Sequence, residues 1–174
     1  ITVFWDVVEA SDFGVPQRRP RSVLVALRAE YMHTFVEPKK RTSRLTVGTA
    51  LRPHLGDWAR ADEWAAGAQV VAPTLVGGSR KHGGADLGPT GAKRAWDRIG
   101  VNGHLVANDP PAADHPGHLT LTVEHAAVLQ GFPSNWVFEG RKTSRYRQVG
   151  NAFPPPVAAA FGRSIARALG QTAE

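Results

Sequence analysis

A cationic loop, Gly14-Val15-Pro16-Gln17-Arg18-Arg19-Pro20-Arg21, lies between two apolar runs of the sequence. The runs cover residues 2–8 and 22–27 and are rich in β-branched and large apolar side chains, which predicts a strand on each side. Because Gly14, Pro16 and Pro20 lie within residues 11–21, between the two runs, we expect no regular element in that whole stretch. Arg19 and Arg21 are two residues apart on extended chain, so their side chains should point the same way. Such a pair can hold a phosphate or a carbonyl oxygen, although a solvated surface loop has the same pattern.

The composition allows one ordinary domain, or one small domain with part of another. The chain has 174 residues, of which 42% are hydrophobic, so a packed core can form. No apolar run is long enough to span a membrane and no basic leader precedes one, so we expect a cytoplasmic protein without membrane contact. The sequence begins at Ile1 rather than at methionine, which favours a product cut from something longer.

The net charge is +6, and 16 of the 21 basic residues are arginine, because only five are lysine. Arginine suits phosphates and guanine edges better than lysine does, so the charge permits nucleic-acid binding. Genomic base composition would give the same excess in a chain this rich in Ala, Gly and Pro. The absence of cysteine excludes disulfides, thiolate metal sites and a cysteine nucleophile from this chain. His33, His54 and His115 lack metal-ligand spacing, so no metal site is predicted.

Residues 45–118 differ from the rest, since glycine, proline and short apolar bursts alternate. We expect a small, loop-rich, mostly β domain there, with short helices within residues 46–60 and 91–99. Arg80 and Lys81 are on a glycine-flanked loop of this region. Glycines let a backbone approach a partner closely, and arginine or lysine can contact guanine in the major groove. An ordinary mobile basic loop is the alternative interpretation.

The last third of the chain predicts two helices. Thr122 can cap a helix that runs to about Leu129 and stops at Gly131. Three prolines at 154–156 precede a second helix that Gly170 ends. Four apolar residues repeat every four positions along one face of that helix: Val157, Phe161, Ile165 and Leu169.

Three segments together resemble the DNA (cytosine-5) methyltransferase family. Residues 14–21 look like its motif VIII, residues 121–133 with Gln130-Gly131-Phe132-Pro133 look like motif IX, and Gly150-Asn151-Ala152-Phe153-Pro154-Pro155 looks like motif X. Thr74-Leu75, followed by paired glycines, resembles the Thr-Leu dipeptide of the family's target-recognition domain. The resemblance covers nearly the whole chain, in the family's order.

The resemblance implies an α/β fold: the C-terminal portion of a Rossmann-like S-adenosylmethionine-dependent methyltransferase domain plus a small, mostly β target-recognition domain. Residues 1–28 would supply catalytic-domain strands with motif VIII. Residues 45–118 would form the target-recognition domain. Residues 119–174 would carry motifs IX and X and return to the catalytic domain.

The resemblance also implies site residues. Arg21 would face the flipped cytosine, with Arg19 and Gln17 supporting its pocket. Asn151 and Ala152 would contact S-adenosyl-L-methionine, most of whose site would lie outside this chain. The expected DNA-binding residues are Thr74, Leu75, Gly77, Gly78, Arg80 and Lys81. In motif IX the family usually has arginines at the positions of Leu119, Val123 and Val128.

The family's chemistry needs a cysteine thiolate that adds to the flipped cytosine. Its Pro-Cys motif, glycine-rich cofactor loop and Glu-Asn-Val motif are absent from this sequence. The resemblance therefore implies the C-terminal part or small subunit of an enzyme that methylates carbon 5 of cytosine in a specific sequence of double-stranded DNA. The chain should be inactive without an N-terminal catalytic half or large subunit. A different class stays open, a catalytically inactive DNA-binding or regulatory module derived from the family.

Overall fold

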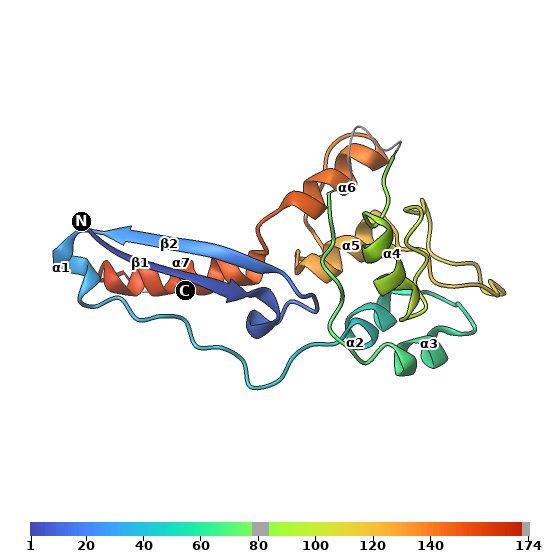
Figure 1. The fold of residues 1–174 in the computed structure, drawn as a ribbon, viewed down its shortest axis with the longest axis horizontal. Coiled ribbons are helices and arrows are strands. Elements are labelled where there is room, and N and C mark those ends of the chain that lie inside the picture. Colours follow the sequence, from blue (N-terminus) through green and yellow to red (C-terminus); the bar gives the residue numbers. More distant parts are fainter. Residues whose placement is uncertain (78–83, 172–174) are drawn as a thin grey trace.

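A computed structural model describes residues 1–77 and 84–171 of the chain. The elements are β1 (Thr2–Glu9), the 3-10 helix η1 (Ala10–Phe13), β2 (Pro20–Leu27), α1 (Ala29–Met32), α2 (Val47–Leu51), the 3-10 helix η2 (Arg52–His54), α3 (Ala61–Gly67), α4 (Thr90–Asp97), α5 (Val123–Gln130), α6 (Lys142–Asn151) and α7 (Pro155–Ala168). Figure 1 shows two lobes: β1, β2, α1 and α7 form the first lobe, and α2 to α6 gather in the second. In the described residues, no helix is both long and apolar enough to cross a bilayer.

The two predicted strands form an antiparallel pair, in register from Thr2 opposite Leu27 to Glu9 opposite Pro20. Both strands are therefore confirmed, and each is slightly longer than expected. The loop between them contains a regular element after all, because η1 directly follows β1. Gly14 ends η1 in a left-handed conformation with φ of +87°, and its N–H bonds back to the helix.

One face of the strand pair packs on α7. Val8 and Val25 from the strands meet Val157 and Phe161 from the helix in a first hydrophobic core. The Phe161 ring lies 6.0 Å from the ring of Phe13 in η1. The predicted apolar face of the last helix is confirmed at Val157 and Phe161, whereas Leu169 lies beyond the helix and is 40% exposed.

A second core fills the other lobe. It is built from buried apolar side chains between residues 47 and 149, among them Trp58, Trp96, Leu119, Val123 and Tyr146. Residues 119–149 thus pack with residues 47–106 in this core. The domain division at residues 28, 45 and 119 stays a prediction. Leu119 and Val123, where the resemblance would place arginines, are buried in this core, and an unpaired charge at either position would be costly.

The expectation of a mostly β region is wrong for the described part of residues 45–118. It forms α2, α3 and α4, and its β contacts are the isolated bridges Gln17–Ala72 and Val101–Leu119. The short helices expected within residues 46–60 and 91–99 are confirmed by α2 and α4. The helix α3 was missed, although Ala61, Trp64 and Ala65 bury one face at helical spacing.

The helix α5 is confirmed at both ends. The Thr122 hydroxyl accepts a hydrogen bond from the His125 N–H, and the His125 ring accepts one from the Thr122 N–H. Gly131 ends the helix with φ of +82°. These two caps set the position of Gln130, the last residue of the helix, which points toward the first lobe's loop.

Candidate functional site

A buried polar junction joins the three predicted motifs to the segment around Leu75. At its centre are the side chains of Gln17 and Arg19, both buried, where the loop after η1 enters β2. Ala72 pairs with this loop, because its N–H donates to Pro16 O at 2.9 Å and its carbonyl accepts from the Arg18 N–H at 2.8 Å. Residues 16–19 thus lie between the two lobes, in contact with both.

The Arg19 guanidinium donates to three backbone carbonyls from distant parts of the chain. Nη1 bonds Leu75 O at 2.6 Å, and Nη2 bonds Gly150 O at 2.6 Å and Ala152 O at 3.1 Å. Burial, and next the neighbouring Arg21, lower the pKa of Arg19 to about 10, while Tyr146 acts in the opposite direction. The side chain therefore stays charged near neutral pH and is held by carbonyl dipoles rather than by a carboxylate.

Gln17 completes the junction. Its Nε2 donates to Leu129 O at 3.1 Å and to Gln130 Oε1 at 2.7 Å, and its Oε1 accepts the Leu75 N–H at 2.7 Å. Gln130 in turn donates from Nε2 to Ala152 O at 2.8 Å. Each motif thus satisfies buried polar groups of the others, although the Nε of Arg19 is buried without a partner among the described residues. Buried networks of this kind fix relative positions.

The two arginines of the predicted cationic edge have different surroundings. Arg19 is buried with both terminal nitrogens bonded inside the chain, so it does not share an exposed edge with Arg21. Arg21 is partly exposed, and its Nη1 donates to Pro20 O at 2.7 Å. The remaining donors of Arg21 have no partner among the described residues.

The expected cofactor residues lie against an expected DNA-binding residue. Asn151 is exposed at the end of α6, and its amide covers Gly77, where an added Cβ would lie 2.3 Å from Asn151 Oδ1. An added Cβ on Gly150 would lie 2.5 Å from the Gly77 Cα. Two glycines therefore let these backbones touch, which the sequence spacing alone did not indicate.

The Thr-Leu dipeptide is anchored rather than free. The Thr74 hydroxyl donates to Arg18 O at 2.6 Å, and the Leu75 side chain is fully buried. Both residues therefore fix the start of the loop that follows. Gly78, Arg80 and Lys81, the other expected DNA contacts of this loop, lie outside the described residues.

The corner at Ala152 is where the sequence predicts cofactor contacts. The Ala152 carbonyl is already shared by Arg19 and Gln130, and its N–H donates to Val149 O at 3.2 Å. What stays open is the exposed amide of Asn151 and the ring of Phe153, which is 41% exposed. Gln130 and Phe153 are not among the site residues expected from the sequence, although Gln130 is the last residue before the helix-ending Gly131.

The comparison with protein families adds to this geometry. The family model of the C-5 cytosine-specific DNA methylases matches residues 2–167. The chain belongs to this family. Members of the C-5 cytosine-specific DNA methylase family use S-adenosyl-L-methionine as the methyl donor.

Two curated relatives in the family cover nearly all of this chain. The type II methyltransferase M.NaeI of Lentzea aerocolonigenes is 52% identical over an alignment of 178 positions, which covers 98% of this chain and 42% of that protein. The type II methyltransferase M.NgoMIV of Neisseria gonorrhoeae is 39% identical over an alignment of 177 positions, which covers 95% of this chain and 54% of that protein. The chain spans about half the length of these relatives.

A solved structure supports the fold. A candidate DNA modification methyltransferase encoded within a prophage (E. coli) superposes with a TM-score of 0.53 at 20% identity, over 98% of this chain and 61% of that one. At this level of identity the likeness shows a shared fold only. The chain is mixed α/β and takes the fold of part of a DNA methyltransferase.

Proposed function

We propose that this chain is the C-terminal part or the small subunit of a DNA (cytosine-5) methyltransferase. The whole enzyme would transfer a methyl group from S-adenosyl-L-methionine to carbon 5 of cytosine in a specific sequence of double-stranded DNA. The observation that carries this proposal is the buried junction of Gln17, Arg19 and Gln130. The Gln17 and Arg19 side chains of motif VIII and the Gln130 side chain of motif IX bond to one another or to backbone groups of motif X and of Leu75, which belongs to the recognition segment that begins with Thr74-Leu75.

Within this function, Arg21 is the residue assigned to the target base. Its donors beyond Nη1 have no partner in residues 1–77 and 84–171, so it can hold the carbonyl oxygen of a flipped pyrimidine by charge-assisted hydrogen bonds. Gln17 and Arg19 are positioning residues, because the Gln17 amide and both terminal nitrogens of Arg19 bond inside the chain. They keep Arg21, Leu75 and the corner at Ala152 in a fixed relation.

The cofactor would lie beside the same corner. S-adenosyl-L-methionine supplies an electrophilic methyl group. Asn151 would bind it through the exposed side-chain amide, and Phe153 would cover an apolar part of it. Arg19 and Gln130 hold the Ala152 carbonyl and so keep this wall in place before the cofactor arrives.

A partner that carries the catalytic cysteine would cover the exposed face of the strand pair. Four apolar side chains on that face are each more than half exposed: Val3, Trp5, Val7 and Leu24. A two-stranded sheet with open edges is marginal by itself and invites further strands. We propose that the catalytic half of the methyltransferase, whether on the same chain or on a large subunit, packs here.

The experiment that tests the proposal exchanges residues 70–92 in the complete enzyme for the corresponding segment of a relative with another target sequence. We expect the methylated site to change while methyl transfer persists. An exchange of residues 163–171, at the end of α7, is the control and should leave the site unchanged. If the enzyme still methylated the original site after the first exchange, residues 70–92 would have no recognition role. That result is the one expected if the chain is a regulatory module.

A further inference from the structure

The connection between the two lobes is tied to the short helix that precedes motif VIII. Residues 33–46 run from α1 to α2 past the strand pair, without a helix or strand of their own (Figure 1). The Asp12 carboxylate of η1 accepts two hydrogen bonds from the Arg44 guanidinium, at 3.2 Å from Nε and 2.9 Å from Nη2. The Asp12 carbonyl accepts the Arg41 N–H at 2.7 Å. One residue of η1 thus holds the connection at two points.

The connection also covers the first residue of motif VIII. An added Cβ on Gly14 would lie 2.6 Å from Arg41 Cζ, so the Arg41 side chain lies directly on this glycine. The Asp12 side chain is 19% exposed, and salt therefore screens its ion pair with Arg44 less than a fully exposed pair. The connection is packed on the start of motif VIII rather than free of it.

The position of Arg44 limits where α2 can begin. Arg44 is three residues before Val47, and three residues of extended chain span at most about 11 Å. The Thr46 hydroxyl caps α2, and the Val47 N–H donates to Val70 O at 2.8 Å. The first helix of the second lobe is therefore kept close to Asp12.

The Asp12–Arg44 pair closes a ring of contacts around motif VIII. From α2 the ring continues to α5, because both helices bury side chains in the second core. Gln130 ends α5 and accepts a hydrogen bond from Gln17, which returns the ring to motif VIII. The buried junction holds the second lobe at one place, and the pair at Asp12 adds an attachment on the other side of Gly14. Two separate attachments oppose a rotation that one would allow.

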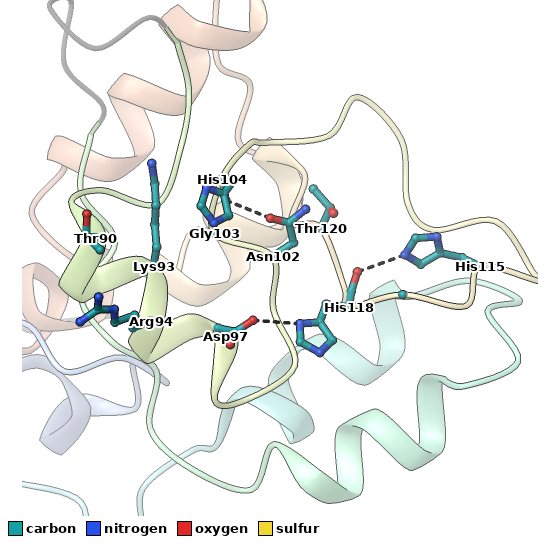
Figure 2. Close-up of a pocket in the computed structure, with 11 residues that line it drawn as sticks. Thr90, Lys93, Arg94, Asp97, Asn102, Gly103, His104, His115, His118 and Thr120 are labelled. Carbon is teal, nitrogen blue, oxygen red and sulfur yellow. Dashed lines mark hydrogen bonds and ion pairs between the residues drawn. The ribbon is translucent and has the colours of Figure 1, made fainter.

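Ion pairs elsewhere in residues 1–77 and 84–171 join parts of a single lobe. Asp97 Oδ1 of α4 lies 3.2 Å from His118 Nδ1, and both residues line a pocket within the second lobe (Figure 2). Arg52 and Asp62 pair between η2 and α3 of the same lobe. The pair at Asp12 differs from these, because it ties the first lobe to the connection that leads into the second.

We infer that Asp12 is a positioning residue for target recognition. The inference rests on the proposed function, in which Arg21 faces the target base and the segment after Leu75 contacts neighbouring bases. Both parts must fit the same duplex, so the angle between the lobes enters the choice of sequence. The Asp12–Arg44 pair holds that angle, and its loss widens the range of sites that are methylated.

The test measures the methylation of every cytosine of a plasmid by the complete enzyme, using bisulfite sequencing. The discrimination ratio is the methylation rate at the preferred site divided by the rate at sites with one base pair changed. Asp12→Asn and Arg44→Gln should each lower this ratio about 10-fold, within the discrimination that one base pair commonly carries. The kcat at the preferred site should change less than about twofold, since neither side chain acts on the reacting groups. Asp62→Asn, which removes an ion pair within the second lobe, is the control and should keep the ratio.

A double variant separates this role from a merely stabilising one. Asp12→Asn combined with Arg44→Gln should lower the ratio no further than either substitution alone, because both act through one contact. An unchanged ratio in Arg44→Gln, which alters an exposed side chain, would overturn the inference. So would a ratio that falls only together with kcat and the melting temperature. A wild-type enzyme that methylated cytosines without any site preference would instead contradict the proposed function itself.

Discussion

Arg19 holds three carbonyl oxygens that belong to residues 75, 150 and 152. A lysine could not replace it, because a point charge on a flexible stem cannot reach all three in the fork geometry of a guanidinium. Truncation would leave the Leu75 and Gly150 carbonyls without this donor, whereas the Ala152 carbonyl would keep its bond from Gln130. Arg19 is therefore the side chain on which the relation between motif VIII, motif X and the recognition segment most depends.

We predict that Arg19→Ala lowers the free energy of unfolding by about 2–6 kcal/mol, because two buried carbonyls lose their donor at about 1–3 kcal/mol each. Urea unfolding followed by circular dichroism measures this. The matched control is Arg18→Ala, since Arg18 is an exposed neighbour and its loss should change stability by no more than about 0.5 kcal/mol. Equal effects of the two substitutions would show that the junction does not stabilise the fold.

Arg21 should behave in the opposite way. In the complete enzyme, Arg21→Ala should lower the methylation rate about 100-fold or more, as loss of a positioned donor to the reacting group does, with little change in DNA affinity. Single-turnover methylation and a binding titration separate the two effects. Arg28→Ala is the control, because Arg28 is exposed at the other end of β2 and pairs only with Glu30 among the described residues. Unchanged methylation by Arg21→Ala would contradict the assignment to the target base.

Gly150 and Gly77 set how closely the recognition segment approaches α6. We expect Gly150→Ala to destabilise the chain by about 1–3 kcal/mol, because its Cβ would overlap backbone atoms of Gly77. Gly162→Ala is the matched control, since a Cβ there meets nothing within 4 Å and should add about 0.5–1 kcal/mol of helix stability. Thermal unfolding of both variants measures these changes in stability. If Gly150→Ala were as stable as wild type, the backbones of Gly150 and Gly77 could separate without cost, which would contradict the close contact.

At the scale of elements, local signals were predictive and long-range ones were not. The ends of α5 followed from Thr122 and Gly131, because caps act within one turn. The helix α6 was missed because its buried residues, Tyr146, Val149 and Gly150, lie among charged and polar neighbours and so give no clear apolar face in the sequence. The mostly β expectation failed because glycine and proline indicate turns but not which elements the turns connect.

The start of α5 should respond to acid. His125 accepts the Thr122 N–H at Nδ1 and contacts His54 O through Nε2 at 3.0 Å, an arrangement that needs the neutral ring with its proton on Nε2. Burial, against the opposing effect of the bond to His54, lowers the pKa of His125 below its ordinary value. The unfolded chain then takes up the proton more readily, so stability is complete above about pH 6.5 and is lost as pH falls through the lowered pKa.

Thermal melts from about pH 7.5 to 5 measure this dependence. We predict that His125→Gln, whose amide oxygen can still accept from Thr122, reduces the loss of melting temperature in acid. The control His33→Gln, at an exposed position, should lose as much melting temperature in acid as wild type does. The capping account would be wrong if both variants lost as much stability in acid as wild type does.

On the scale of the whole molecule, the chain has two hydrophobic cores joined by a polar junction. The family segments and their order could be predicted from the sequence, because the motifs are contiguous. The burial of Arg19 could not, since its three acceptors lie 56, 131 and 133 residues away along the chain. Nor could the contact of Gly77 with Asn151, which depends on how the second lobe folds.

The exposed face of the strand pair should cause association. We predict that Trp5→Lys reduces both self-association of the chain and its binding to the catalytic half, because Trp5 is 64% exposed at the centre of that face. Sedimentation velocity measures both. Val36→Lys, at an exposed apolar residue outside the strands, should leave both unchanged. Identical sedimentation of Trp5→Lys and wild type would place the interface elsewhere.

The most direct test of the proposed function mixes this chain with a separately produced catalytic half that carries the cysteine nucleophile. Labelled S-adenosyl-L-methionine and duplex DNA are added, and the label in 5-methylcytosine is measured by mass spectrometry of the digested DNA. The chain itself contains no cysteine, so the account predicts label only when both parts are present. Label from this chain alone, or none from the assembled pair, would contradict it.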